Sequence, residues 1–286
     1  MPELPEVQTI VDDLNRKIKG AVIFDFWTGW EKGIKMDLGK FKKDIIGKKI
    51  IDVKRRGKNL LFDLSGNLVM HVHLKMTGHL LVKSGKEKSG FFSEKVNQYI
   101  RHSWHLKKNG KILQLDFSDL RKFGKIRLMD GKEFLDDLEL NRLGIEPLSK
   151  EFDLKKFKEI LKRKSHWPVR DILMDQSIIA GIGNIYASEI MFEAGILPKR
   201  KAESLSADEI KKVFREIKAV LKKAVKLRGT SDSDYRDTDG AKGGFQEVLK
   251  VYNREGRACQ RKRCKGTVKR EKLKQRSAFF CLNCQK

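Results

Sequence analysis

The two residues after Met1 could perform covalent chemistry. If Met1 is removed, Pro2 becomes a free N-terminal secondary amine. An α-amino group titrates near pH 8, so a useful fraction is neutral at physiological pH and can attack a sugar or carbonyl carbon. The adduct of a secondary amine is a cationic iminium, which withdraws electrons strongly. Glu3 lies beside it as a candidate proton donor and acceptor, so both residues are candidate catalytic groups.

The residues that follow have an ordinary structural explanation. Pro5 suits the first turn of a helix, and Glu6 suits its positive end. Apolar residues then recur at helical spacing as far as Ile18, which predicts an amphipathic helix over residues 5–19. This helix does not require Pro2 and Glu3, so it leaves their catalytic interpretation open.

The four cysteines of the chain favour a metal site. They form two close pairs near the C-terminus, Cys259-x4-Cys264 and Cys281-x2-Cys284. This pairing is typical of a zinc ribbon, in which two β-hairpin knuckles each offer two thiolates to one tetrahedral ion. Lysine and arginine greatly outnumber acidic residues around these pairs, so we expect the ribbon to face phosphate.

Composition points to a polyanionic partner. The chain of 286 residues has a formal net charge of +25, which favours nucleic acid, although the same charge could serve solubility alone. No run of about 18 apolar residues predicts a membrane span, and the N-terminus lacks an apolar signal core. We expect a cytoplasmic protein.

The elements that must position these groups change character along the chain. Short β-rich runs separated by turn residues occupy about residues 20–135 and predict a sandwich or barrel. After Pro147 the pattern becomes helical, with helices expected at 155–164, 169–180, 184–194 and 206–227. Residues 84–98 are polar and predict an exposed loop, and residues 228–245 are rich in Gly, Ser and Asp, as in a functional loop.

Several turns carry groups suited to nucleic acid. Arg121 and Phe123 could insert into a duplex as a charged group and an apolar wedge, and Met76 lies in a second such turn. Gly181 and Gly183 permit close backbone approach, and Asn184 could cap a helix whose N-terminus binds phosphate. Each turn alone has a structural explanation as a hairpin or a helix–helix connection.

Taken together, these segments resemble the bacterial formamidopyrimidine-DNA glycosylases, which repair oxidised purines. The matching stretches run in the family's order: Pro2-Glu3-Leu4-Pro5-Glu6-Val7, Arg56-Gly57-Lys58, His73-Leu74-x-Met76, Arg121-Lys122-Phe123-Gly124, Gly181-Ile182-Gly183-Asn184-Ile185-Tyr186-Ala187, Val251-Tyr252-Asn253-Arg254-x-Gly256, Gln275-Arg276 and the cysteine pairs. Their joint specificity is high.

The resemblance implies an α+β multidomain fold. An N-terminal β-sandwich with an N-terminal helix would span residues 1–135, a helical helix-two-turn-helix DNA-binding domain 148–245, and a zinc ribbon 246–286. Residues 229–245 resemble a loop that closes over an oxidised purine. The implied partner is double-stranded DNA with a flipped-out damaged base, because a base inside the stack is out of reach. The implied cofactor is one structural Zn²⁺, and the implied state is a nucleoid-associated monomer.

The same resemblance implies a role for each site residue. Pro2 would attack C1′ and displace the base, Glu3 would handle protons during ring opening, Lys58 would assist β-elimination, and Arg276 would assist δ-elimination. Met76, Arg121 and Phe123 would fill the hole left by the flipped base, with Arg121 bonded to the orphaned cytosine. The residues matched to DNA contacts are His73, Met76, His102, Arg121, Phe123, Arg163 and Asn184. The implied zinc ligands are Cys259, Cys264, Cys281 and Cys284.

Two other functions remain open from the residues. One is an endonuclease VIII-like enzyme for oxidised pyrimidines, against which the Arg121-Lys122-Phe123 wedge and the intact 229–245 loop argue. The other is a noncatalytic zinc-ribbon nucleic-acid-binding protein, which would need no free Pro2. The chain also departs from the family pattern, with Leu120 in place of a proline and a longer spacing between Cys259 and Cys264.

Overall fold

The computed structural model describes residues 1–85 and 90–286, which divide into two compact units. Unit 1 comprises Met1–Asn141 and Leu227–Gln246, and unit 2 comprises Arg142–Lys226 and Glu247–Lys286. The loop that we expected within a 148–245 helical domain therefore clusters with unit 1. The division into three functional parts remains a prediction.

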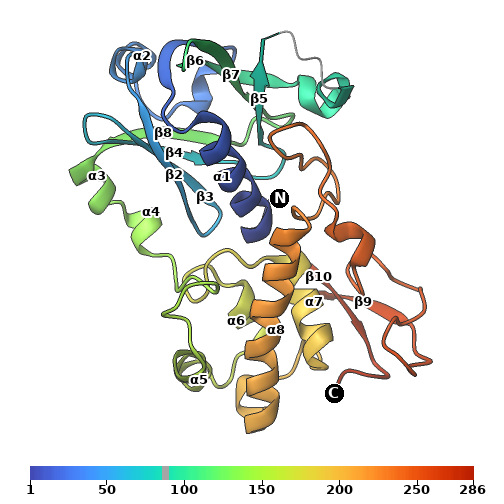
Figure 1. Ribbon diagram of the computed structural model, residues 1–286. Helices are drawn as coiled ribbons and strands as arrows, with labels where there is room; N and C mark the ends of the chain where they lie inside the picture. The colour runs from blue at the N-terminus through green and yellow to red at the C-terminus, as the bar shows by residue number, and fades with distance from the viewer. Residues whose placement is uncertain (86–89) are drawn as a thin grey trace. The chain divides into compact units, whose positions relative to one another are not determined.

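Unit 1 is a β-sandwich with an N-terminal helix, as predicted (Figure 1). The strands of one antiparallel sheet are, in spatial order, β2 (Ile50–Arg56), β3 (Asn59–Leu64), β4 (Leu68–His73) and β8 (Lys125–Asp130). Those of the other are β1 (Val22–Thr28), β6 (Ile100–Lys108), β7 (Lys111–Ser118) and β5 (His79–Ser84). Apolar side chains from both sheets and the first helix form one core.

The first helix, α1 (Leu4–Ile18), confirms the predicted helix almost to the residue. Glu3 and Glu6 form a capping box that satisfies backbone N–H groups at its start. Its apolar stripe is fully buried, and the helix packs against β2, β3 and β5. Burial of this stripe therefore fixes where the chain's first residues lie.

The remaining elements of unit 1 are short. They are α2 (Leu38–Ile45), α3 (Gly131–Leu135), α4 (Leu138–Asn141) and three 3-10 turns, η1 (Glu31–Gly33), η2 (Gly90–Ser93) and η3 (Lys95–Gln98). The expected exposed loop at 84–98 is therefore partly ordered, and its residues 86–89 lie outside the described residues. Asn97 is buried, and its side chain bonds His79 and the carbonyl of Gly240.

Unit 2 contains the expected helices and a C-terminal hairpin. They are α5 (Leu154–Arg163), α6 (Val169–Met174), α7 (Asn184–Ala194), α8 (Ala207–Lys226), β9 (Val268–Leu273) and β10 (Arg276–Cys281), with the 3-10 turn η4 (Ala202–Ser204). A further 3-10 turn, η5 (Phe245–Val248), spans the chain boundary between the two units. α6 is shorter than the predicted 169–180 because the Asp175 carboxylate accepts from the backbone N–H of Ser177, a local bond that competes with helix. Within this unit, α7 packs against α6, α8 and β10.

A buried carboxylate joins α7 to residues 250–252, which precede the first cysteine pair. Glu189 on α7 is 2% exposed and accepts backbone N–H bonds from Lys250, Val251 and Tyr252 at 2.9, 3.0 and 2.9 Å. Burial raises the pKa of Glu189, and the three donors oppose that shift. No helix within the described residues is long and apolar enough to cross a membrane.

Candidate active site and metal centre

The candidate catalytic residues Pro2 and Glu3 lie at the start of α1 and are both buried. The backbone N–H of Glu3 donates to Glu6 Oε2 at 2.7 Å. The other oxygen of Glu6 accepts from the backbone N–H of Thr230 at 2.7 Å. Glu6 therefore joins the first turn of α1 to the 227–246 loop and fixes the backbone that carries the candidate nucleophile.

The turn that carries Lys58 is held against the same helix. It connects β2 and β3, and Gly57 within it adopts a left-handed φ of 57°, which glycine accepts without strain. The guanidinium of Arg55 donates to Gln8 Oε1 on α1 and to the Gly57 carbonyl, at 2.9 Å each. Lys58 itself is 6% exposed. The structure thus brings the Lys58 turn to the first turns of α1.

His73 lies at the end of β4 and is oriented as a hydrogen-bond donor. Its Nδ1 accepts from the backbone N–H of Lys75 at 2.9 Å, so the proton of the neutral ring lies on Nε2. Burial, together with nearby positive charge on Lys75, lowers the pKa of His73 to about 3. The side chain is therefore a neutral N–H donor, a group that can bind a phosphate oxygen.

The structure also brings together the three residues expected to enter the duplex. Met76 and Phe123 are 43% and 49% exposed, and Arg121 is exposed between them. Arg121 Nη1 contacts Met76 Sδ at 3.2 Å, and its guanidinium lies over the Phe123 ring, 4.7 Å from the centroid. We call Met76, Arg121 and Phe123 the wedge cluster.

Asp119 holds the two turns of the wedge cluster together. It is fully buried, and its Oδ2 accepts from the backbone N–H groups of Phe123 and Gly124 at 2.8 Å each. Its Oδ1 accepts from the Thr77 hydroxyl and from the backbone N–H of Arg121. One carboxylate therefore sets the position of both turns.

In unit 2, a buried arginine links two candidate phosphate contacts. Arg170 on α6 is 2% exposed, and its Nη2 donates to Asn184 Oδ1 at 2.6 Å and to the Ser277 carbonyl at 3.3 Å. Ser277 follows Arg276, which is exposed and lines a cavity of about 430 Å³ with Arg170, Trp167 and other residues. Because Asn184 Oδ1 faces Arg170, its amide N–H₂ is left to donate elsewhere.

The expected helix cap at Asn184 is wrong. Gly183 is the N-cap of α7, and Asn184 is the first helical residue, with its oxygen engaged by Arg170 rather than by backbone N–H groups. The N-terminus of α7 consequently lacks a side-chain cap.

Two weaker candidates lie elsewhere. His102 is fully buried beside Phe26 and Trp30, and its Nδ1 bonds the Thr28 hydroxyl at 2.9 Å. It offers no exposed atom to a ligand, so we no longer assign His102 a direct DNA contact. Arg163 ends α5, is exposed and lines a cavity of about 670 Å³.

The four cysteines form one cluster with the geometry of a tetrahedral metal site. Their Sγ atoms all lie within 4.8 Å of one another and form no disulfide. The Cys259–Cys284 and Cys264–Cys281 Sγ distances are both 3.7 Å, against about 3.8 Å for a tetrahedral ion with metal–sulfur bonds of about 2.3 Å. Cys264 Sγ also accepts N–H bonds from Gly266 and Asn283. These residues could hold a metal ion.

Three supporting residues were missed by sequence reasoning. Asp119 and Glu189 are buried carboxylates that accept several backbone N–H bonds, and Arg170 is a buried cation. The one detectable signal was Arg170, a charged residue among the apolar Val169, Ile172 and Leu173 of a short helix. Nothing in a single sequence distinguishes Asp119 from an ordinary turn aspartate.

Comparisons with known proteins agree on one family. Residues 1–126 match the model of the formamidopyrimidine-DNA glycosylase N-terminal domain, and residues 143–235 match that of the formamidopyrimidine-DNA glycosylase H2TH domain. A curated formamidopyrimidine-DNA glycosylase of Carboxydothermus hydrogenoformans is 42% identical over 288 residues, covering 100% of each chain.

Solved structures give the same result. The Lactococcus lactis Fpg in complex with DNA containing an abasic site matches with a TM-score of 0.86 and 30% identity, covering 99% of each chain. The wild-type Lactococcus lactis enzyme with DNA containing an oxidised pyrimidine matches with a TM-score of 0.85 and 30% identity, covering 100% of each chain.

Proposed function

The chain belongs to the formamidopyrimidine-DNA glycosylase family, and we propose that it removes oxidised purines from DNA through a Schiff base on Pro2. It is a bifunctional DNA glycosylase and abasic-site lyase acting on oxidised bases in double-stranded DNA. The proposed substrates are 8-oxoguanine and formamidopyrimidines.

One observation carries the assignment of Pro2 as nucleophile. The turn bearing Lys58 is tied to α1 through Arg55, and the residues at the start of α1 are Pro2 and Glu3. An amine, a carboxylate and an ammonium group therefore belong to one region of unit 1. These are the groups that attack on a sugar carbon, proton transfer and elimination require.

The proposed reaction begins after Met1 is removed. The Pro2 nitrogen forms a bond to C1′ as the bond from C1′ to the base breaks, and the base leaves with the electron pair and takes up a proton. Opening of the sugar ring, with Glu3 moving the proton to the ring oxygen, leaves a cationic iminium between Pro2 and C1′.

The iminium then drives strand cleavage. Its positive charge acidifies the C2′ proton, whose removal expels the 3′ phosphate, with Lys58 as the supporting cation. A second elimination expels the 5′ phosphate, with Arg276 in the corresponding role. The products are the free base, the two phosphate ends of the gap and a sugar fragment released when water hydrolyses the iminium.

We assign DNA contacts to both units. His73 in unit 1 and Asn184, Arg276 and Arg163 in unit 2 are proposed phosphate contacts, and the orientation of His73 as an N–H donor supports its role. The wedge cluster would fill the space left by the flipped nucleotide, with Arg121 bonded to the unpaired cytosine. Residues 229–245 would form the lesion-recognition loop.

The proposed metal is one structural Zn²⁺ on the four-cysteine cluster. When bound, the ion would cross-link the two cysteine pairs beside β9 and β10 and hold the turn that presents Arg276. The longer Cys259–Cys264 spacing is accommodated, because all four sulfurs still converge.

Borohydride trapping tests the proposed nucleophile. Wild type and Pro2→Gly would each be incubated with a duplex containing 8-oxoguanine opposite cytosine, and reduction would convert an imine into a stable protein–DNA crosslink. We expect a crosslink that peptide mapping places on Pro2 and that the variant loses or alters. Protein with Met1 removed that excises the base without a Pro2 crosslink would refute the mechanism.

Oxidised pyrimidines are the second candidate substrate, since a similar Lactococcus lactis structure holds one in its DNA. Rates on matched duplexes containing 8-oxoguanine or thymine glycol separate the two assignments. We expect faster excision of 8-oxoguanine, and a preference for thymine glycol would reverse the assignment.

A further inference from the structure

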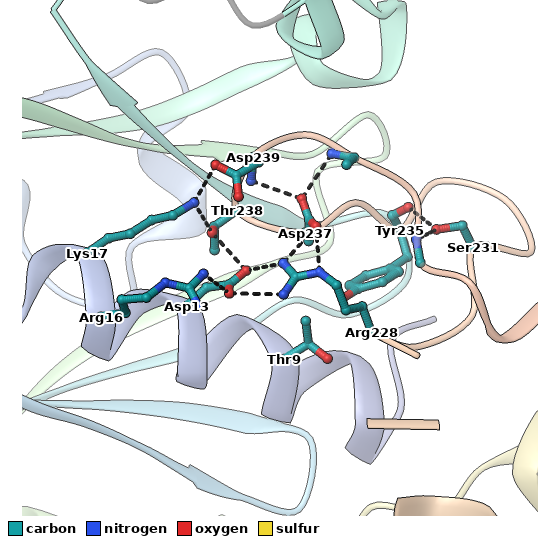
Figure 2. Close-up of polar contacts among 12 residues, drawn as sticks. Thr9, Asp13, Arg16, Lys17, Arg228, Ser231, Tyr235, Asp237, Thr238 and Asp239 are labelled. Atoms are coloured by element: carbon teal, nitrogen blue, oxygen red, sulfur yellow. Dashed lines mark hydrogen bonds and ion pairs between the residues drawn. The ribbon is translucent and has the colours of Figure 1, made fainter. Parts of the chain in front are cut away.

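An ion-pair network joins the 227–246 loop to helix α1 (Figure 2). The guanidinium of Arg228 donates to both oxygens of Asp13, at 3.2 and 2.5 Å, and to Asp237 Oδ2 at 3.0 and 2.7 Å. The Thr238 hydroxyl donates to Asp13 Oδ2 at 3.0 Å. The side chains of Asp13 and Asp237 are 1% and 4% exposed, whereas that of Arg228 is 39% exposed, so the carboxylates are buried and the guanidinium partly reaches solvent.

Arg228 sits in a backbone conformation that favours glycine. Its φ is 63°, in the left-handed region where a side chain is strained. Burial alone would raise the pKa of Asp13, but the hydrogen bonds and charge of Arg228 outweigh it, so that pKa lies below its ordinary value. The contacts of the Arg228 guanidinium therefore offset the conformational free energy that its left-handed backbone costs.

The same loop is also attached to α1 and its surroundings elsewhere. The backbone N–H of Thr230 donates to Glu6, whose other oxygen holds the N–H of Glu3. Tyr235 is 5% exposed and packs in the core of unit 1. By contrast, Asp232 and Ser233 between these attachments are exposed. The loop is therefore fixed at several places, with an exposed segment among them.

The three clustered carboxylates do not call for a metal ion. Asp13, Asp237 and Asp239 have oxygens within 4.8 Å of one another, but Arg228 bridges the first two. Lys17 pairs with Asp239 at 2.5 Å and donates to Thr238 at 2.7 Å. Cationic side chains already supply the counter-charge that a divalent ion would provide.

We infer that the Asp13–Arg228 bridge positions the proposed lesion-recognition loop relative to Pro2, by fastening the loop to the helix that begins at the nucleophile. This inference rests on the proposed function. Asp13 and Arg228 are positioning residues, because they act through the loop. Excision of a damaged base needs the loop in place, whereas cleavage at a preformed abasic site needs Pro2 but has no base to recognise. Loosening the bridge should therefore separate the two activities.

The experiment compares Asp13→Asn with a matched control, Asp137→Asn. Asp137 is also a buried carboxylate of unit 1 paired with an arginine, Arg127, and its side chain is 2% exposed. Single-turnover rates would be measured on a duplex with 8-oxoguanine opposite cytosine and on one with a preformed abasic site. We expect Asp13→Asn to slow base excision about 10- to 100-fold, as displacement of a positioning group by about 1 Å does. Abasic-site cleavage should fall less than about threefold on the same grounds, because Pro2 is retained.

A second variant distinguishes loss of loop positioning from loss of folding. Arg228→Gly removes the guanidinium but suits the left-handed backbone, so the unit should still fold. It should show the same selective loss of excision, and Asp137→Asn should leave the ratio of the two activities at the wild-type value. Equal loss of both activities in Asp13→Asn and Arg228→Gly, or no loss in either, would overturn the inference. Wild type inactive on both duplexes would instead refute the proposed function.

Discussion

Both units use buried carboxylates that accept backbone N–H bonds, Glu189 being the one in unit 2, and unit 2 adds a cluster of four cysteines. In unit 1, buried carboxylates collect backbone N–H groups: Glu6 at the start of α1 and Asp119 between the two turns of the wedge cluster. In unit 2, the hairpin that bears Arg276 is flanked by two cysteine pairs whose four sulfurs converge. A carboxylate site is complete once the chain folds, whereas four thiols at this spacing need a cation to favour their charged forms. Unit 1 should therefore be preorganised by its own side chains, and the hairpin of unit 2 by an ion.

Removal of the proposed zinc ion is expected to perturb this comparison most. A structural zinc site of this type contributes about 10 kcal/mol of folding free energy, so a strong chelator should unfold the hairpin and leave unit 1 folded. DNA affinity should fall at least about tenfold as the phosphate contacts of the hairpin are lost. Amide hydrogen exchange and a DNA titration, each with and without chelator, measure the two effects. Unchanged protection of β9 and β10 in metal-free protein would contradict the prediction.

Asp119→Asn tests the carboxylate side of the comparison. The substitution replaces an acceptor with an N–H₂ group that faces backbone donors, and should lower the free energy of unfolding of unit 1 by about 3 kcal/mol. Opposite-base discrimination should fall as well, because both turns of the wedge cluster lose their common anchor. Urea unfolding and excision from duplexes with each opposite base provide the readouts.

Asp116→Asn is the matched control for that variant. Asp116 is also fully buried and accepts from Ser103, Gln114 and Lys83, which lie away from the wedge cluster. It should reduce stability without altering discrimination. Equal effects of the two variants on discrimination would show that Asp119 acts only through global stability.

The folding stability of unit 1 should fall at mildly acidic pH, above the pH range in which its carboxylates are protonated. Burial lowers the pKa of His71 and His102 to about 4 and that of His73 to about 3. An unfolded histidine titrates near 6.5, so the stability contributed by these neutral rings is complete above about pH 6.5 and is lost as pH falls toward 4. Urea unfolding measured between pH 7 and 4.5 should show that the protein takes up protons when it unfolds. In His71→Gln this uptake should be smaller by almost one proton. A pH-independent free energy of unfolding over this range would exclude the effect.

Arg121→Ala is expected to have the smallest and most selective effect. It removes the proposed contact with the orphaned cytosine but leaves the Asp119 anchor, whose bond is to the backbone N–H of Arg121. Discrimination by the opposite base should fall about tenfold, the value of one good base contact, with little change in binding to undamaged DNA. If the variant lost opposite-base discrimination and nonspecific DNA affinity to the same extent, the proposed contact between Arg121 and the unpaired cytosine would be refuted.

Much of the fold was predictable because its signals are local. The periodicity of residues 5–19 predicts α1 closely, and the alternating runs predict the sandwich. The helix expected over 169–180 ends early because an aspartate side chain bonds the backbone two residues later, and this choice depends on the surrounding structure. The association of residues 227–246 with unit 1 involves contacts between residues far apart in sequence, such as Arg228 and Asp13.

The residues of the candidate site likewise differ in how well the sequence alone predicts them. Residues at conspicuous positions, such as Pro2, Arg121 and the cysteines, are proposed directly from the sequence. Buried residues that support the site, such as Asp119 and Arg170, can be recognised only from their contacts in the structure. The burial of His102 likewise follows from packing beside aromatic rings that are separated from it in sequence.

The return of residues 227–246 to unit 1 also bears on how the chain folds during synthesis. A ribosome that has made residues 1–141 has produced both sheets of the sandwich, yet Asp13 still lacks Arg228 and the core still lacks Tyr235. These partners are made only after most of unit 2 has been translated. The first unit to emerge is thus completed late, and in a fragment ending at Asn141 the buried carboxylate of Asp13 would keep Arg16 as a partner but lack Arg228.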